Sequence, residues 1–165
     1  MQLHLQDESR TLELGAQLGE VLKRYGPCPL LFRGPLGSGK TTLVRGLVGV
    51  YPGGEQAEVT SPSFNLVNIY PTSPEIIHLD LYRILPGSSD EILDEYLNPS
   101  QDQIIVEWSE HLAVQDYPDQ SVLLCLDHCG ATRRATLRGQ GKLGAEILAR
   151  LQTENVKAGP RPAPG

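Results

Sequence analysis

The chain has 165 residues, and its 14 Lys and Arg against 20 Asp and Glu give a net charge of −6. This length suits one compact domain. A hydrophobic fraction of 39% with 21% charged residues is enough for a packed core and argues against a disordered chain. The acidic balance argues against a protein that grips nucleic acid through a broadly basic surface. If a nucleic acid is involved, we expect a partner to hold it.

The sequence shows no membrane or secretory signal. No apolar run approaches the ~20 residues that span a bilayer. Residues 1–10 are polar and acidic, without the basic and then apolar order of a signal peptide. Cys28, Cys125 and Cys129 are an odd number and lack the second pair that a zinc site requires. We therefore expect a cytoplasmic protein with reduced, structural thiols.

The first part of the chain predicts two helices and a strand around a glycine-rich loop. Apolar residues recur at helical spacing over 11–25, and the apolar run 29–33 is typical of a buried strand. The glycine-rich segment 34–42 follows, and residues 43–48 return to helical spacing. A strand, a loop and a helix in this order predict a parallel βα unit.

The rest of the chain predicts several short strands. Residues 65–70 and 76–82 have strand patterns and are joined by the turn 71–74, which contains two prolines, so we expect a hairpin. The further elements expected in chain order are a short helix at 89–96 with a capping pair at Ser88 and Glu91, strands at 104–108, 121–126 and 134–137, and a helix at 141–151.

Together these elements predict an α/β fold. The βα unit requires parallel neighbours, whereas the hairpin and the strand pair near the C-terminus are antiparallel. We expect a three-layer α/β/α sandwich of the P-loop NTPase type with a mixed parallel and antiparallel sheet. Residues 1–155 are expected to form the single domain. Residues 156–165 include three prolines and two glycines and are expected to be a disordered tail.

The glycine-rich segment carries the clearest chemical signal. Residues 34–41 fit the phosphate-binding pattern Gly-x-x-x-x-Gly-Lys-Thr without a gap. Glycines let backbone N–H groups approach phosphate oxygens that a Cβ would obstruct, and a helix beginning near Lys40 directs its positive dipole end at the same anion. Lys40 adds a full positive charge, and the Thr41 hydroxyl suits a magnesium ion. The motif predicts a nucleoside triphosphate site.

Hydrolysis or transfer of a phosphoryl group also requires an acid near the metal and a group that orients the attacking molecule. Two apolar strands end in such acids, Asp80 and Glu107. The pattern does not rank one above the other, so both remain candidates. The Asn-Lys-x-Asp and Thr-Lys-x-Asp runs that read guanine are absent from the sequence, which favours ATP.

Four blocks occur in order along the chain, and together they resemble one family. They are 36–47 around the loop, 59–67 with Thr-Ser-Pro-Ser-Phe, 78–83 with His-x-Asp-x-Tyr-Arg, and 106–108 with Val-Glu-Trp. These blocks resemble the TsaE (YjeE) family of bacterial P-loop ATPases, and the resemblance covers about residues 9–140. It implies ATP and Mg²⁺ as cofactors and an ATPase that is weak alone and active with partner proteins.

The resemblance also implies a pathway and partners. Members of the family act with the proteins TsaB and TsaD in installing threonylcarbamoyladenosine on tRNAs that read codons beginning with A. Their ATP hydrolysis serves repeated turnover rather than the transfer chemistry. We therefore expect an accessory ATPase that meets tRNA only indirectly, through the complex.

Site residues follow from the resemblance, position by position. Lys40, Asp80 and Glu107 are the implied catalytic residues, with Asp80 supporting the metal or the attacking water. Thr41 and Glu107 are the implied magnesium ligands. The residues implied to hold the nucleotide are Thr11, Gly37, Ser38, Gly39, Lys40, Thr41 and Thr42.

Two further positions enter with the resemblance. Residues 60–64 match a switch-like loop in which the family usually has a threonine at the place of Ser63. The hydroxyl is retained, so we expect its role to survive. Trp108 either flanks the site or packs in the core, and the sequence favours neither.

The roles of four residues remain open at this level. Arg83, Arg133 and Arg134 are candidates for contacts with phosphate, adenine or a partner, but a solvated or salt-bridged arginine is the more common case. His78 and Asp80 are two apart in a strand and share a face, so a hydrogen-bonded pair is one of two open alternatives.

Two other functions are compatible with a phosphate-binding loop. The first is a small-molecule kinase, although no arginine-rich lid segment is evident between Glu107 and the C-terminal helix. The second is a nucleotide-gated binding module with negligible turnover. A kinase would consume ATP in proportion to a phosphorylated acceptor, whereas the accessory ATPase would need only water and its protein partners.

Overall fold

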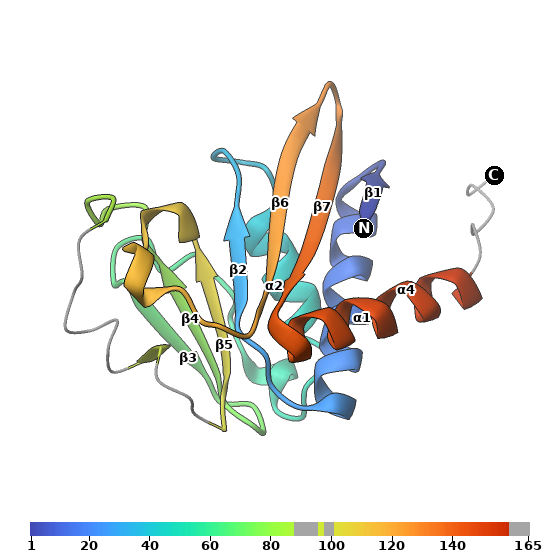
Figure 1. Cartoon of the computed structure of the whole chain (residues 1–165), viewed down its shortest axis with the longest axis horizontal. Helices are drawn as coiled ribbons and strands as arrows, with labels where there is room; N and C mark the ends of the chain where they lie inside the picture. Colours follow the sequence, from blue (N-terminus) through green and yellow to red (C-terminus); the bar gives the residue numbers. More distant parts are fainter. Residues whose placement is uncertain (88–95, 98–100, 159–165) are drawn as a thin grey trace.

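A computed structural model describes residues 1–87, 96–97 and 101–158, which build a seven-stranded sheet in the order β1-β7-β6-β2-β5-β4-β3 (Figure 1). The strands are β1 (Gln2–Leu5), β2 (Leu30–Arg33), β3 (Val67–Tyr70), β4 (Ile76–Asp80), β5 (Gln103–Glu107), β6 (Ser121–Cys129) and β7 (Thr132–Gln140). The helices are α1 (Glu8–Tyr25), α2 (Lys40–Val48) and α4 (Gly141–Ala158), and short 3-10 turns are η1 (Gly54–Gln56), η2 (Ser109–His111) and η3 (Val114–Asp116).

The sheet is mixed, which confirms the predicted α/β class. Strand β2 runs parallel to β5 and β6, and β4 runs parallel to β5. The pairs β3–β4, β6–β7 and β1–β7 are antiparallel, so the predicted hairpin 65–82 is confirmed. Parallel neighbours end at the same edge of a sheet, where α/β proteins place their ligands. Asp80 and Glu107 are register partners at that edge.

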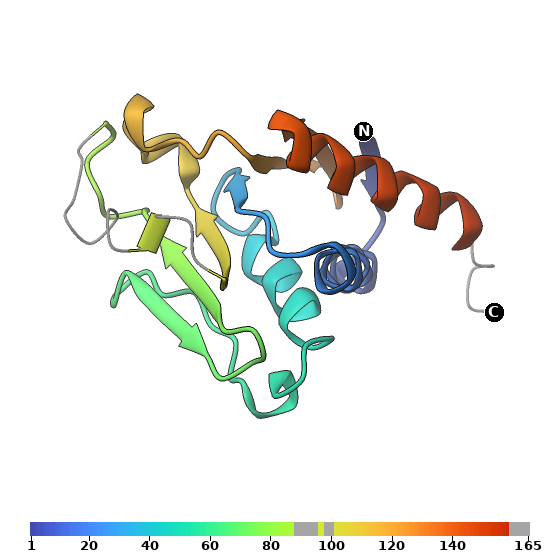
Figure 2. The same cartoon turned by 60° about the horizontal axis from the view of Figure 1, so that its bottom comes forward.

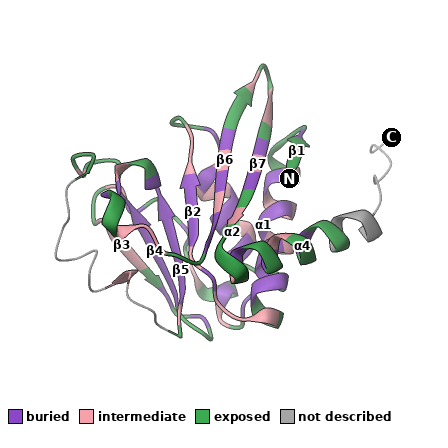
Figure 3. Ribbon diagram, viewed as in Figure 1, coloured by how far each residue is buried: buried purple, intermediate pink, exposed green. Residues whose placement is uncertain are grey.

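The larger hydrophobic core lies on one face of the sheet. Leu30 and Phe32 of β2 point into it, together with residues of α1, α2 and α4. Figure 2, in which α1 is seen nearly end-on, shows α2 beside α1. Strands β2, β4 and β5 are buried over most of their length (Figure 3). The strands that lead to the candidate site are therefore the most enclosed in the fold.

The opposite face carries a smaller core. Leu31 of β2 points into it, and the segments after β4 and β5 cover it with Leu81 and Leu112. The predicted helix at 89–96 with its capping pair falls almost wholly outside the described residues. The second helical layer of a three-layer sandwich therefore stays a prediction on this face.

Several boundaries differ from the sequence expectation for local reasons. Helix α1 begins at Glu8 because the Asp7 carboxylate caps it and accepts from the Arg10 N–H at 2.9 Å. The strand predicted at 104–108 ends at Glu107, because Trp108 turns the chain with a φ of 57°. Strand β1 was not expected, since its four residues are too few for a clear period and it is defined by pairing with β7.

The C-terminal helix also differs from its expected length. Helix α4 continues past residue 151 to Ala158, because no helix breaker occurs before Gly159 and Pro160. It thus takes in residues 156–158 of the expected tail, and 159–165 lie outside the described residues. None of the helices in the described part of the chain is long and apolar enough to cross a membrane. The three cysteines are free thiols.

Helices α1 and α2 approach each other closely at two glycines. A Cβ on Gly15 of α1 would lie 2.1 Å from the carbonyl oxygen of Leu43, and one on Gly46 of α2 would lie 2.1 Å from that of Leu12. Both distances are far below van der Waals contact, so neither position accepts a side chain without moving a helix backbone. This contact holds α2, and with it the glycine-rich loop, against α1.

We predict that Gly15→Ala destabilises the fold by about 1–3 kcal/mol, because the new methyl group separates α1 from α2. Thermal unfolding followed by circular dichroism measures the change. The matched control is Gln17→Ala on the same helix, which is half-buried and should change stability by only about 0.5 kcal/mol. Equal melting temperatures for both variants would contradict the close approach.

Candidate functional site

The glycine-rich loop joins β2 to α2 and is shaped by positive φ angles. Gly34, Gly37 and Gly39 have φ values of 137°, 76° and 102°. Gly39 is the residue before α2, and a Cβ there would lie 3.2 Å from the Arg133 Nε and 3.4 Å from the Thr11 Cγ2. The left-handed backbone and this crowding both favour glycine. The loop thus leads directly into the first turn of α2, where backbone N–H groups without an intrahelical partner suit an anion.

Lys40 lies over its own loop. Its Nζ donates to the carbonyl oxygens of Gly34 at 2.8 Å and Pro35 at 3.2 Å and lies 4.4 Å from the centre of the Trp108 ring. Burial lowers the pKa of Lys40, while the carboxylates of Glu107 and its neighbours oppose the shift. The cation is held at the loop by carbonyls and a ring face, contacts that an anion in the pocket can replace.

The two candidate acids have different partners. Glu107 is 2% exposed, and its Oε1 accepts from the Thr41 hydroxyl at 2.8 Å. Asp80 accepts from the Ser61 hydroxyl through Oδ2 and from the Tyr82 N–H at 2.9 Å through Oδ1. Glu107 therefore belongs with the first turn of α2, and Asp80 belongs with the loop that precedes β3. The sequence leaves these roles open because they depend on which side chain reaches which strand end.

His78 contacts Glu107, which decides between the alternatives for its partner. Its Nε2 lies 3.0 Å from the Glu107 Oε1, and its Nδ1 lies 3.0 Å from the Tyr70 hydroxyl. No hydrogen bond to Asp80 is found within the described part of the chain. The register explains this, because His78 stands opposite Ile105 and its side chain reaches along the neighbouring strand to Glu107.

A pocket of about 520 Å³ opens between the loop and the two acids. Residues 36–42 form one wall, and Asp80, Glu107 and Trp108 form another. The expected nucleotide residues Gly37 to Thr42 all line this pocket. A volume of this size lies within the range of small-molecule sites.

Thr11 is the one expected nucleotide residue that does not line the pocket. It is fully buried in α1, where its hydroxyl donates to the Asp7 carbonyl at 3.3 Å. Its methyl group lies behind Gly39. In this structure Thr11 therefore supports the loop from behind.

The three arginines left open by the sequence separate into two groups. Arg83 and Arg133 line the pocket, and the Arg83 guanidinium lies 4.5 Å from the centre of the Phe64 ring. The Arg133 Nε is buried and has no hydrogen-bond partner among the described residues. Arg134 is exposed, and its Nη2 lies 3.7 Å from the Cys129 Sγ. Only Arg83 and Arg133 are thus in a position to reach a ligand in the pocket.

The oxygen atoms in the pocket fit a magnesium ion shared with a phosphate. Mg²⁺ prefers hard oxygen ligands and usually takes one or two from the protein, with the remainder from phosphate and water. Thr41 and Glu107 bring a hydroxyl and a carboxylate oxygen to within 2.8 Å of each other. No group of three or more His, Cys, Asp or Glu in residues 1–87, 96–97 and 101–158 is placed to hold a metal by itself.

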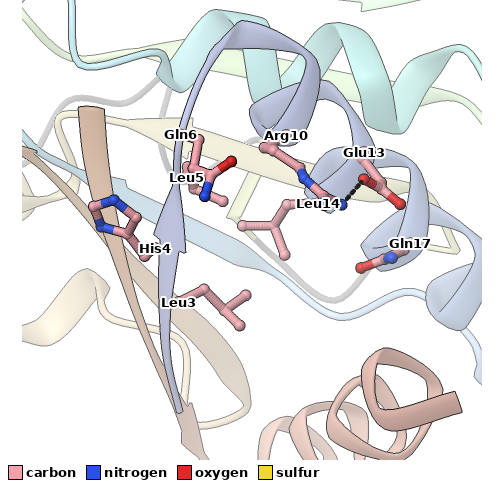
Figure 4. A pocket seen from close by; sticks show the side chains of 8 residues that line it. All are labelled: Leu3, His4, Leu5, Gln6, Arg10, Glu13, Leu14 and Gln17. Atoms are coloured by element: carbon pink, nitrogen blue, oxygen red, sulfur yellow. Dashed lines mark hydrogen bonds and ion pairs between the residues drawn. The ribbon is translucent and has the colours of Figure 1, made fainter. Parts of the chain in front are cut away.

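A second cavity lies between β1 and α1 (Figure 4). Its volume is about 170 Å³, and the ion pair between Arg10 and Glu13, with Nη1 2.7 Å from Oε2, lines its helical side. It is smaller than typical small-molecule pockets. The pocket at the glycine-rich loop is therefore the stronger candidate site.

Comparison with known proteins decides the family. Residues 5–136 match the model of the family described as threonylcarbamoyl adenosine biosynthesis protein TsaE. The chain belongs to the TsaE family. The expected resemblance is thereby confirmed over most of the chain.

Two TsaE proteins align with most of this chain and with nearly all of their own length. The tRNA threonylcarbamoyladenosine biosynthesis protein TsaE of Haemophilus influenzae is 31% identical over 88% of this chain and 94% of its own. The protein of the same name from Streptomyces coelicolor is 38% identical over 79% of this chain and 90% of its own.

A solved structure shares the fold. Bacillus subtilis YdiB superimposes with a TM-score of 0.71 over 94% of this chain and 95% of its own, at 22% identity. At that identity the likeness concerns the fold, which agrees with the mixed seven-stranded sheet. This TsaE chain therefore shares its fold with YdiB.

We predict that Lys40→Met changes the fluorescence of Trp108, the only tryptophan in the chain, before any ligand is added. The substitution keeps the length of the side chain and removes the cation 4.4 Å from the ring. The emission spectrum of the purified protein measures the change. Lys142→Met, on the exposed start of α4, is the control and should leave the spectrum unaltered. Identical spectra for all three proteins would contradict the contact.

Proposed function

We propose that this chain binds ATP with Mg²⁺ at the glycine-rich loop, hydrolyses it, and serves as the accessory ATPase in forming threonylcarbamoyladenosine on tRNA. The contact of the Thr41 hydroxyl with Glu107 beside the Lys40 cation carries this proposal. This contact lies beside a glycine-rich loop that has the sequence motif of P-loop NTPases. Membership of the TsaE family and the names of its relatives support the pathway.

Each group at the pocket has a defined task in this proposal. Backbone N–H groups of 37–42 and the Lys40 ammonium bind the phosphates. Thr41 and Glu107 would hold the magnesium ion, which when bound neutralises phosphate charge. Asp80, fixed by Ser61 and the Tyr82 N–H, supports the metal or orients the attacking water. The reaction class is hydrolysis of the terminal phosphoryl group.

The partners in this proposal are TsaB and TsaD, with tRNA reached through their complex in the cytoplasm. Two observations favour a protein partner over direct tRNA binding. The net charge is −6, which opposes phosphate backbones. Leu36 and Phe64, which line the ATP pocket, are 77% and 84% exposed. Large exposed apolar side chains around a pocket suit contact with another protein.

The deciding experiment is an ATPase assay of the full chain alone, with TsaB and TsaD, and with both proteins and tRNA. We expect slow release of phosphate by the chain alone and faster release with the partners. Lys40→Ala is the control and should lower turnover by a factor of about 10² or more, because it removes the cation at the phosphates. Phosphate transfer to a small acceptor in place of water would favour the kinase instead.

We predict different losses for the two acids. Glu107→Gln should weaken the Mg²⁺ dependence of ATP binding, because an amide is a poorer magnesium ligand than a carboxylate. Asp80→Asn should keep affinity closer to the wild type and lower turnover by about 10²-fold. Calorimetry with and without Mg²⁺, next to phosphate release, measures both. An Asp80→Asn protein with full turnover would contradict its role.

A further inference from the structure

A row of buried polar side chains crosses three strands behind the pocket. Tyr70 of β3, His78 of β4 and Glu107 of β5 are each less than 5% exposed. Residues two apart share a strand face, and register partners share a sheet face. His78 and Asp80 therefore lie on one face with Glu107, the register partner of Asp80. Burial of this kind is costly unless every group is hydrogen-bonded.

The row is hydrogen-bonded from end to end. The Thr41 hydroxyl donates to the Glu107 Oε1 at 2.8 Å, and the His78 Nε2 lies 3.0 Å from the same oxygen. The Tyr70 hydroxyl lies 3.0 Å from the His78 Nδ1 and 3.2 Å from the carbonyl oxygen of Thr60. Thr60 begins the segment 60–66 that forms part of the pocket. One chain of contacts thus runs from α2 to this segment.

The donors and acceptors in this row of side chains can be assigned from the number of protons that each group carries. A carboxylate oxygen only accepts, so the ring nitrogen that faces Glu107 carries the proton. The other nitrogen of a neutral imidazole is then an acceptor. Tyr70 has one hydroxyl proton and two acceptors within reach, the His78 Nδ1 and the Thr60 carbonyl. Burial raises the pKa of Tyr70, which keeps the hydroxyl protonated.

We propose that Tyr70 and His78 are positioning residues that couple the carboxylate of Glu107 to the loop of residues 60–66. Any ligand that separates Glu107 from Thr41 changes the acceptor that His78 faces. A change at His78 alters how strongly its Nδ1 accepts the hydrogen bond from the Tyr70 hydroxyl. The hydrogen bond from Tyr70 to the Thr60 carbonyl then changes in strength as well. The effect of a bound ligand rests on the proposed function, whereas the coupling in the ligand-free protein does not.

The loop is suited to respond because the hydrogen bonds that join it to β3 and β4 in the described structure lie at its two ends. The Thr60 carbonyl also accepts from the Asn68 side chain at 3.1 Å, and the Ser61 hydroxyl donates to Asp80. At the other end the Leu66 carbonyl accepts from the Asp80 N–H at 3.0 Å, and Leu66 has a φ of 68°. Between the two ends Phe64 is 84% exposed, with the Arg83 guanidinium 4.5 Å from the centre of its ring. The loop is therefore connected to both candidate acids. Thr60 reaches Glu107 through Tyr70 and His78, and Ser61 contacts Asp80 directly.

The test compares Tyr70→Phe, His78→Leu and the double variant in the full chain without ligand. Amide hydrogen exchange of Asn65 and Leu66, whose N–H groups donate to the Pro62 carbonyl, reports loop opening. We predict exchange about fivefold faster in each single variant, as for the loss of one buried hydrogen bond. The double variant should be no faster than the singles, because one connected path is broken in each case. Additive effects would overturn the coupling.

Tyr51→Phe is the matched control, since Tyr51 is another buried tyrosine and contacts neither His78 nor Thr60 through a hydrogen bond in the described structure. It should leave loop exchange unchanged. If His78→Leu does not fold, Tyr70→Phe removes only one oxygen atom and still decides the ligand-free prediction. Wild-type exchange rates in Tyr70→Phe would overturn the proposal.

A second measurement adds the ligand and separates positioning from simple packing. Mg²⁺ with ADP is the probe, and calorimetry gives its affinity with the metal and in the presence of a chelator. We predict that Tyr70→Phe weakens binding about fivefold only when Mg²⁺ is present, and that the ligand no longer changes Asn65 and Leu66 exchange. An equal loss with the chelator would contradict coupling through Glu107. If the wild type binds no ADP, the proposed function fails, while the ligand-free exchange still tests Tyr70 and His78.

Discussion

The parallel alignment of β2, β5 and β4 is the constraint on which the rest of the site depends. Because these strands run in one direction, the start of the glycine-rich loop and both acids reach the same edge of the sheet. Glu107 pairs in register with Phe32 on one side and with Asp80 on the other. A shift of one residue in β5 would turn the Glu107 side chain to the opposite face and away from Thr41.

This arrangement concentrates charge in an enclosed place. Lys40, Asp80 and Glu107 are each less than 5% exposed, although charged residues are seldom buried unless they are paired. Lys40 donates to loop carbonyls, and the two carboxylates contact hydroxyl groups, the Tyr82 N–H and the His78 ring. These contacts do not fully replace the hydration that the charged groups lose on burial. The apolar packing of α1 and α2 against the sheet offsets this cost. The free energy gained in the hydrophobic core thus allows the charged side chains to stay in positions that suit a ligand.

Much of the fold followed from local patterns. The helix 11–25, the strand 29–33 and the hairpin 65–82 could be predicted because each has a clear period and a turn signal. Strand β1 could not be, because four residues have no useful period and their pairing with β7 links the two ends of the matched segment. Trp108 also could not be placed, since its position over Lys40 depends on a left-handed turn directly after β5.

The sequence by itself determined the family, the phosphate-binding motif and the short list of acids, because spacing along the chain is what defines a motif. Only the tertiary structure decided which acid meets Thr41, that His78 pairs with Glu107 rather than Asp80, and that Arg133 lines the pocket while Arg134 does not. The physical reason is register and rotamer. A side chain finds its partner across strands and loops that are distant in sequence, and local pattern carries no information about that distance.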